Sequence, residues 1–209
     1  MTENIVDNYG WKTERGTCAT EYIVPAIKAI LSSLQAKRVV DLGSGNGVLC
    51  AEVAKAKIEI VGVEYDLGGV NIARKFYPKI PFYNFGVQDD PDDLLKHEAP
   101  FDVVISTEVV EHLFSPHLLP IYAHAVLTQG GYLVISTPFH GYLKNLALSI
   151  FGKWDKHHTA LWHGGHIKFW SKRTLTELLE NNGFSVVQFL GVGRFPYLWK
   201  SMILVAKKV

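Results

Sequence analysis

Cysteine is scarce in this chain. Cys18 and Cys50 are the only two cysteines among 209 residues, and their spacing matches no metal-ligand or redox motif. This excludes a disulfide framework and a cysteine zinc site, both of which need several cysteines in regular patterns. We therefore expect a reducing, cytoplasmic setting.

Long apolar runs and an excess of one charge are also missing. No stretch reaches the roughly 18 apolar residues that a membrane span needs, and residues 1–10 are polar and acidic, unlike an export signal. Lys and Arg total 21 against 20 Asp and Glu, for a net charge of +1. This balance argues against DNA binding and general RNA binding, which favour a basic surface.

The remaining composition is that of a globular domain. Hydrophobic residues make up 48% of the chain and charged residues 20%, which excludes disorder and coiled coil. We expect one domain over residues 1–209, with a helical N-terminal cover over about 1–35 and an inserted lid over about 138–165.

Short β-branched runs alternate with segments of helical length, a pattern typical of βαβ units and a parallel sheet covered by helices on both faces. The expected strands are 38–42, 59–64, 80–85, 101–107 and 131–137. The expected helices are 20–34, 48–56, 68–76, 108–127 and 171–182, with Pro116 as a candidate break in the fourth. Two final runs, at 184–190 and 201–206, are joined by a short turn and should pair antiparallel.

The lid breaks this alternation and is rich in aromatic residues and histidine. An apolar stripe at helical spacing runs along it, flanked by Lys144 and Lys153. The stripe either packs on the body of the protein or contacts a membrane surface or a lipid substrate. It consists of Leu143, Leu146, Ala147, Ile150 and Phe151. Four lid aromatics, Phe139, Tyr142, Trp154 and Trp162, either line an acceptor pocket or serve ordinary packing.

The clearest chemical signal is the segment 39–47, a buried strand that runs into a turn with glycine at alternate positions. Such a loop lets backbone approach a ligand closely. A dinucleotide motif would place its third glycine at Val48. Asp41, directly before the turn, would repel a pyrophosphate and attract an ammonium or sulfonium group. A cationic nucleoside therefore fits better than a dinucleotide.

Two later strand ends supply polar residues for the rest of a nucleoside. Glu64 follows the second strand, where an acidic side chain can accept hydrogen bonds from ribose hydroxyls. After the third strand, Gln88 or Asp89 could meet an adenine amino group, with the register among Gln88, Asp89 and Asp90 left open.

Taken together, these motifs resemble those of class I S-adenosylmethionine-dependent methyltransferases. The resemblance covers about residues 30–138, through segments 41–47, Glu64, 101–108 and 127–133. It implies an α/β, Rossmann-like three-layer sandwich whose seven-stranded sheet is mostly parallel with an antiparallel last strand. It also implies S-adenosylmethionine as cofactor. The expected cofactor-binding residues are Asp41, Gly43, Ser44, Gly45, Gly47, Glu64, Tyr65, Asp89, Thr107 and Glu108.

A second constellation follows the fourth strand. Glu108, Glu111 and His112 are spaced i, i+3 and i+4, so on the expected helix they share one face. With His166 as a fourth ligand they could bind Mg²⁺, Mn²⁺ or Zn²⁺. The alternatives are a metal-free general base, with His112 and His166 as catalytic residues, or a structural role at a helix N-terminus.

The Glu-x-x-Glu-His segment and the distant His-x-x-Phe-Trp segment resemble two methyltransferase groups. These are the ubiquinone-biosynthesis O-methyltransferases and the small-RNA 3′-terminal 2′-O-methyltransferases. The near-zero net charge favours the first group, which implies methylation of a hydroxyl on a small aromatic or amphipathic molecule. RNA 2′-O-methylation, nicotinamide-dependent oxidoreduction and non-catalytic nucleoside binding remain alternatives.

Overall fold

The computed structural model describes residues 10–11, 13, 15–16, 19–158, 161 and 164–209. A seven-stranded sheet with the order β3-β2-β1-β4-β5-β7-β6 forms its centre. The first five strands are parallel, and β7 pairs antiparallel with both neighbours, as predicted. The strands are β1 (Arg38–Leu42), β2 (Glu59–Val63), β3 (Phe82–Tyr83), β4 (Phe101–Thr107), β5 (Leu127–Pro138), β6 (Phe184–Val192) and β7 (Ser201–Lys208).

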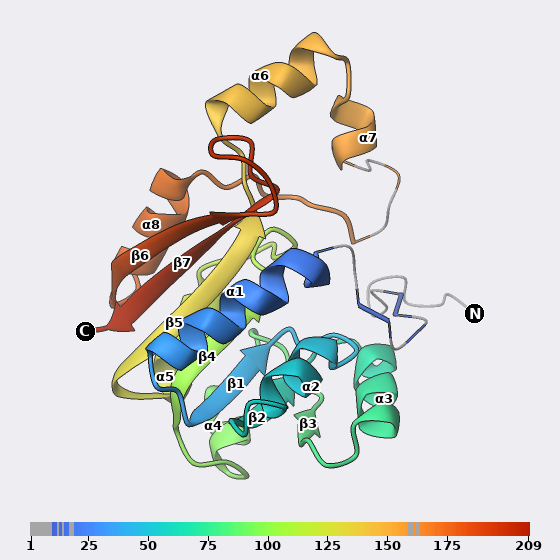
Figure 1. The fold of residues 1–209 in the computed structure, drawn as a ribbon. Coiled ribbons are helices and arrows are strands. Elements are labelled where there is room, and N and C mark those ends of the chain that lie inside the picture. Colours follow the sequence, from blue (N-terminus) through green and yellow to red (C-terminus); the bar gives the residue numbers. More distant parts are fainter. Residues whose placement is uncertain (1–9, 12, 14, 17–18, 159–160, 162–163) are drawn as a thin grey trace.

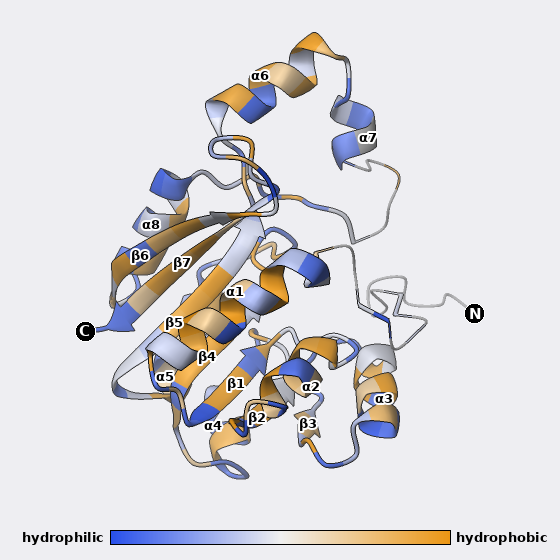
Figure 2. Ribbon diagram, in the orientation of Figure 1, coloured by the Kyte–Doolittle hydropathy of each residue, from blue (hydrophilic) through white to orange (hydrophobic). Residues whose placement is uncertain are grey.

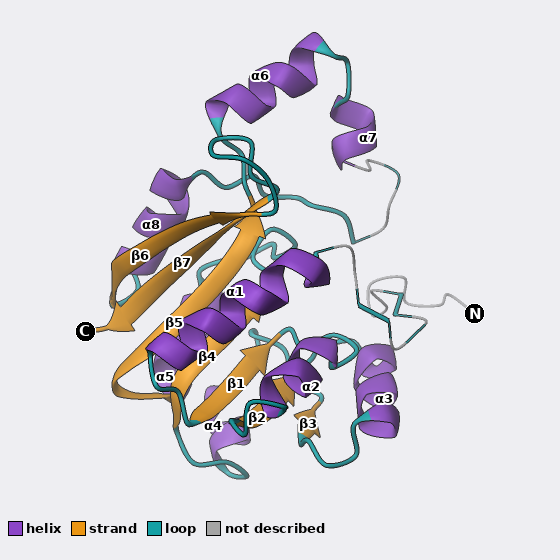
Figure 3. Cartoon of the chain, in the orientation of Figure 1, coloured by secondary structure: helices purple, strands orange, loops and turns teal. Residues whose placement is uncertain are grey.

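Helices cover both faces of the sheet, which makes the predicted three layers (Figures 1 and 3). Successive residues of a strand point to opposite faces, so Val39 joins the core under α1, α2 and α3, and Val40 joins the core under α4, α5 and α8. The middle parts of the central strands are correspondingly apolar (Figure 2). The helices are α1 (Thr20–Ser33), α2 (Val48–Ala54), α3 (Leu67–Phe76), α4 (Pro91–Leu95), α5 (Leu118–Val126), α6 (Tyr142–Ile150), α7 (Trp154–His158) and α8 (Lys172–Glu180).

The predicted helix over 108–127 is wrong in its first half. Residues 108–117 form turns, and α5 begins only at Leu118. Two features oppose helix here: Glu108 has a left-handed φ of 55°, and Pro116 disfavours helical backbone at the residue before it. The short helix α4, capped by Asp90 with Pro91 at its first turn, was not predicted.

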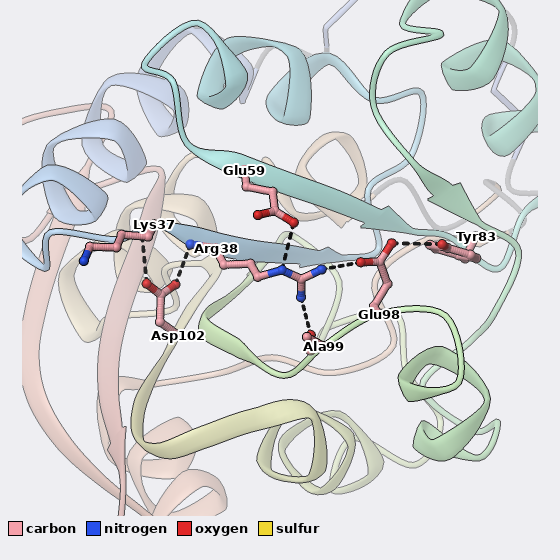
Figure 4. Close-up of polar contacts among 7 residues, drawn as sticks. All are labelled: Lys37, Arg38, Glu59, Tyr83, Glu98, Ala99 and Asp102. Atoms are coloured by element: carbon pink, nitrogen blue, oxygen red, sulfur yellow. Dashed lines mark hydrogen bonds and ion pairs between the residues drawn. The ribbon is translucent and has the colours of Figure 1, made fainter.

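A charged network holds the amino ends of the strands, opposite the glycine loop (Figure 4). Arg38, at the start of β1, pairs with Glu59 across the strands at 2.8 Å and with Glu98. The carboxylate of Asp102 accepts the backbone N–H groups of Lys37 and Arg38 at 2.7 and 3.0 Å. These contacts fix the register of β1 against β2 and β4, and thereby the position of the loops at the other edge.

The lid helices α6 and α7 stand beyond the carboxyl end of β5, away from the helical layers (Figure 1). None of the residues of α6 is buried, and Leu143 and Ile150 are 52% and 68% exposed. Of the two alternatives for the apolar stripe, packing on the body is therefore wrong for these exposed residues. Lys144 Nζ attaches the helix by donating to the backbone oxygens of Phe139 (2.8 Å) and Lys200 (3.4 Å).

Among the described residues, no helix is both long and apolar enough to span a bilayer. Where in the cell the protein works stays a prediction from the sequence.

Candidate active site

A cavity of about 710 Å³, the first cavity, opens at the carboxyl ends of β1, β2 and β4. This is the edge of an open α/β sheet where ligands bind. Most of the predicted cofactor residues line it, although they come from three separate segments of the chain. They are Asp41, Gly43, Ser44, Gly45, Glu64, Tyr65, Thr107 and Glu108.

The glycine loop curves around this cavity because its backbone is left-handed at each glycine. Gly43 has a φ of 82°, and a Cβ there would lie 2.4 Å from Val109 Cγ2. Gly47, at the N-terminus of α2 with a φ of 81°, faces the core, where a Cβ would lie 2.8 Å from Phe82 Cζ. Gly47 therefore shapes the turn, and it is not among the residues that line the cavity.

Glu64 connects the loop to the neighbouring strand end. Its Oε2 accepts the Gly45 N–H at 2.7 Å, and its Oε1 accepts the Asp66 N–H at 2.7 Å. Burial raises the pKa of this carboxyl above its usual value. Since each carboxylate oxygen has two lone pairs, Glu64 can hold the loop and still accept hydrogen bonds from ribose hydroxyls.

Asp41 is a buried carboxyl with unused hydrogen-bonding capacity. It is 1% exposed, and its Oδ2 accepts a weak bond from Cys50 Sγ at 3.5 Å. Its Oδ1 has no hydrogen-bond partner within the described parts of the chain. Burial, reinforced by the nearby Glu64, raises the pKa of Asp41 to about 7. A cationic ligand in the cavity would stabilise its ionised form.

Of the polar residues Gln88, Asp89 and Asp90 that follow β3, only Gln88 lines the first cavity. Asp89 turns back into its own loop, where its Oδ2 accepts the Gly86 N–H at 2.7 Å, and it does not line the cavity. Asp90 caps α4. Gln88 lines the cavity and is the polar side chain of this segment that can reach a nucleoside base.

Glu108 does not share a helical face with Glu111 and His112, because the segment forms turns. Its carboxylate accepts the hydroxyls of Ser136 at 2.9 Å and Ser201 at 3.2 Å. Burial raises the pKa of Glu108 to about 7. The two serines come from β5 and β7, and nothing in the local sequence pattern indicated them.

Three of the four predicted metal ligands nevertheless converge. Glu111, His112 and His166 each offer a ligand atom, and these atoms lie within 4.8 Å of one another; Glu108 is not in this cluster. The cluster forms because the backbone N–H groups of Ile167 and Lys168 donate to the Glu111 carbonyl oxygen at 2.9 and 3.0 Å.

The Glu111 carboxylate is buried with only weak compensation, because the nearby Thr137 hydroxyl and the Glu111 backbone offset only part of the effect of burial on its pKa. The residue is 1% exposed, and neither carboxylate oxygen has a hydrogen-bond partner in the part of the chain that the structure describes. Burial and the charge of Glu108 both raise its pKa well above the usual range. Such a group is a candidate metal ligand, because a cation would offset the cost of burying its charge.

His112 has one ring nitrogen fixed by the backbone. Its Nδ1 lies 2.7 Å from the Gly164 carbonyl oxygen, which can only accept, so the ring carries a proton on Nδ1 and its lone pair on Nε2. Nε2 lies 4.0 Å from Glu111 Oε1. Burial lowers the pKa of His112 below its usual value, so the imidazole is neutral at pH 7.

A second cavity, of about 660 Å³, adjoins the first. The two cavities share a wall of three residues, Ala19, Glu108 and His112. His166 lines the second cavity but not the first. Two ligands, one in each cavity, would meet at Glu108 and His112.

Comparison with known proteins decides the family. A family model for a methyltransferase domain matches residues 19–189, most of the chain. The chain belongs to this methyltransferase family. Membership confirms the prediction of an S-adenosylmethionine-dependent methyltransferase, and it favours methyl transfer over the nicotinamide-dependent reaction that the glycine loop had left open.

Two relatives of this methyltransferase are named ubiquinone biosynthesis O-methyltransferase. The protein from Ruegeria sp. (strain TM1040) is 30% identical over 173 residues, 78% of this chain and 66% of the relative. The one from Bradyrhizobium sp. (strain ORS 278) is 27% identical over 172 residues, 80% of this chain and 66% of the relative. The chain thus spans just under two thirds of the length of these curated relatives.

A solved structure with the same fold is magnesium protoporphyrin IX methyltransferase from Synechocystis PCC 6803 with bound SAH. Its TM-score to this methyltransferase is 0.67 at 18% identity, with 90% of this chain and 82% of that chain covered. At this identity the likeness establishes the fold, and it confirms the predicted Rossmann-like sandwich.

The aromatic residues that line the second cavity of this methyltransferase are not the four lid aromatics, for which ordinary packing was the alternative. The cavity lining does not include Phe139, Tyr142 or Trp154, and Trp162 lies outside the described residues. Tyr22, Phe151 and Trp199 line it instead. Tyr22 and Trp199 come from α1 and from the turn before β7, so only the folded chain brings them to the lid.

Proposed function

We propose that this protein transfers the methyl group of S-adenosylmethionine to a hydroxyl of a small aromatic or amphipathic molecule. The observation that carries the proposal is the shared wall of the two cavities, with Glu108 and His112 between them. The names of the relatives support an oxygen acceptor, and the SAH in the Synechocystis enzyme supports the cofactor.

The first cavity suits this cofactor along its whole length. Glu64 would accept the ribose hydroxyls, Gln88 lies at the base, and the buried Asp41 would pair with the positive charge of the amino-acid part. Thr107 and Tyr65 complete the wall. The sulfonium methyl would then face Glu108 and His112.

His112 is our proposed proton acceptor. The acceptor oxygen forms a bond to the methyl carbon, the carbon–sulfur bond breaks with its electron pair left on sulfur, and the hydroxyl proton passes to Nε2. A neutral imidazole can do this for a phenol, whose pKa is near ~10. His166, which burial also keeps neutral with a pKa of about 4, would orient the acceptor from the second cavity.

Binding of a divalent cation is a second candidate role for the same residues, favoured by the buried Glu111 carboxylate. Glu111, His112 and His166 combine oxygen and nitrogen donors suited to Mg²⁺, Mn²⁺ or Zn²⁺, and the Gly164 carbonyl fixes the His112 tautomer as metal-bound histidines require. Such an ion would lower the pKa of an acceptor hydroxyl. The two roles exclude each other, since a coordinated Nε2 cannot take a proton.

Methyl-labelled S-adenosylmethionine tests the proposed function. The labelled cofactor is incubated with the protein and either catechol or a metabolite extract. We expect labelled methyl ethers and SAH, both detected by mass spectrometry. An oligoribonucleotide with a free 3′ end is the comparison substrate. Labelling of its terminal 2′ oxygen, with none on small hydroxyl compounds, would reverse the assignment.

Chelation separates the two roles. The cation role predicts that a chelator abolishes turnover and that added Mg²⁺, Mn²⁺ or Zn²⁺ restores it. Glu111→Gln keeps the size of the side chain but removes its charge, so this variant should lose the restoration. Turnover that is unchanged in chelator contradicts the cation role and leaves His112 as the base.

The lid is our proposed contact for an apolar part of the acceptor or for a lipid surface. Leu143, Ile150 and Phe151 are 52%, 68% and 69% exposed on one short segment. Clustered exposed apolar side chains of this kind mark binding surfaces. Phe151 also lines the second cavity, so the surface is continuous with the acceptor site.

A further inference from the structure

Positive charge is concentrated in the second cavity. Lys144, Lys153, Arg194 and Lys200 all line it, and Glu108 is the one carboxylate among its described lining residues. No ion pair within the described residues joins any of these four cations to a carboxylate, whereas other cations of the chain are paired in this way. Glu108 attracts Lys144 and offsets part of this charge, so a net positive charge faces the cavity.

The fold holds part of this charge in place. Lys144 is half-buried, and its two backbone bonds fix Nζ between Phe139 and Lys200. Burial lowers the pKa of Lys144 to about 8, against the attraction of Glu108 and with a smaller contribution from repulsion by Arg194. The ammonium is thus charged at pH 7 but poorly solvated, and a bound anion would stabilise it. An ammonium has three N–H donors, so a third remains for a ligand.

Apolar side chains lie beside the cations in the same cavity. Leu148 and Phe151 come from the lid, and Leu198 and Trp199 come from the turn before β7. A ligand that fills this space must combine an apolar or aromatic body with an acidic group. Its hydroxyl would have to reach the wall at Glu108 and His112.

We propose that the methyl acceptor carries an anionic group, a carboxylate or a phosphate, in addition to the hydroxyl that is methylated, and that Lys144 and Arg194 bind this group. The inference rests on the proposed function, because it identifies the second cavity as the acceptor site. It narrows the acceptor to hydroxylated aromatic or amphipathic acids.

Calorimetry on the protein saturated with SAH tests the inference without requiring turnover. The probes are catechol, 3,4-dihydroxybenzoate and 3,4-dihydroxyphenylphosphonate, which share the diol and differ in the acidic group. We expect at least one acid to bind about tenfold more tightly than catechol, as one good charge-assisted contact provides. The preferred acid distinguishes carboxylate from phosphate recognition.

Arg194→Glu should reduce the ratio of acid to catechol affinity about tenfold or more, and high salt should reduce it in the wild type. Arg194 is exposed, so the variant should fold. Lys79→Glu is the matched control, because it makes the same charge change at an exposed residue outside both cavities. The control should retain the wild-type ratio.

Equal binding of catechol and both acids overturns the inference. An unchanged ratio of acid to catechol affinity in Arg194→Glu overturns it as well. If that variant keeps the ratio but no longer co-sediments with phosphatidylserine vesicles, the cations bind a lipid headgroup instead. Failure of the proposed function is a different result: SAH and the acid bind, but no methyl group is transferred to any hydroxyl compound.

Discussion

We expect His112→Ala to lower kcat by about 100- to 10,000-fold, the usual contribution of a positioned general base, while SAH still binds. His112 lines both cavities and has its lone pair on Nε2, so its removal leaves no neutral base at the wall that the two cavities share. Its side chain brings no charge to the cofactor cavity at pH 7. Initial rates with labelled cofactor and calorimetry with SAH measure the two effects separately.

Two further variants separate proton transfer from a structural role. His112→Asn can still donate to the Gly164 carbonyl but cannot act as a base, so we expect it to be as inactive as the alanine variant and to melt near the wild-type temperature. His117→Ala removes an exposed histidine outside both cavities and should be fully active. Recovery of turnover in His112→Asn would show that His112 only positions its neighbours.

The fold was predictable where neighbouring residues decide the structure. Ser171 was predicted to start the last helix, and it accepts the Thr174 N–H in a reciprocal cap. The short link between the last two strands requires them to be antiparallel, as β6 and β7 are. The glycine loop follows from the same kind of local rule, because its left-handed turns need glycine.

The site was predictable only in part, because distant segments complete it. The spacing of Glu108, Glu111 and His112 is that of one helical face, but the backbone turns at Glu108, and serines about 28 and 93 residues away hold its carboxylate. His166 reaches the cluster through backbone bonds to Glu111 that no sequence pattern encodes. The cations and aromatics of the second cavity likewise come from the lid and the turn before β7, which pack together only in the folded chain.

Asp41→Asn should weaken SAH binding about 10- to 150-fold at pH 8. This is the effect of losing a hydrogen bond to a charged group, which contributes ~1.5–3 kcal/mol. The wild-type affinity should itself depend on pH. The pKa of Asp41 is about 7 in the free protein, and a bound ammonium favours the ionised form and lowers this pKa. Binding therefore releases a proton near neutral pH, and affinity rises from pH 6 to pH 8.

A Cys50 variant tests whether Asp41 causes the pH dependence of SAH affinity. The Cys50 thiol donates to Asp41 Oδ2 and lowers the pKa of that carboxyl, so Cys50→Ala should move the midpoint of the pH dependence upward without removing it. Asp41→Asn should reduce this pH dependence and bind SAH nearly as weakly at pH 8 as the wild type does at low pH. Asp41→Asn does not threaten the fold, since the asparagine removes a charge that is costly to bury. An Asp41→Asn protein that keeps both the wild-type affinity and its full pH dependence would show that the positive end of the cofactor lies elsewhere in the cavity.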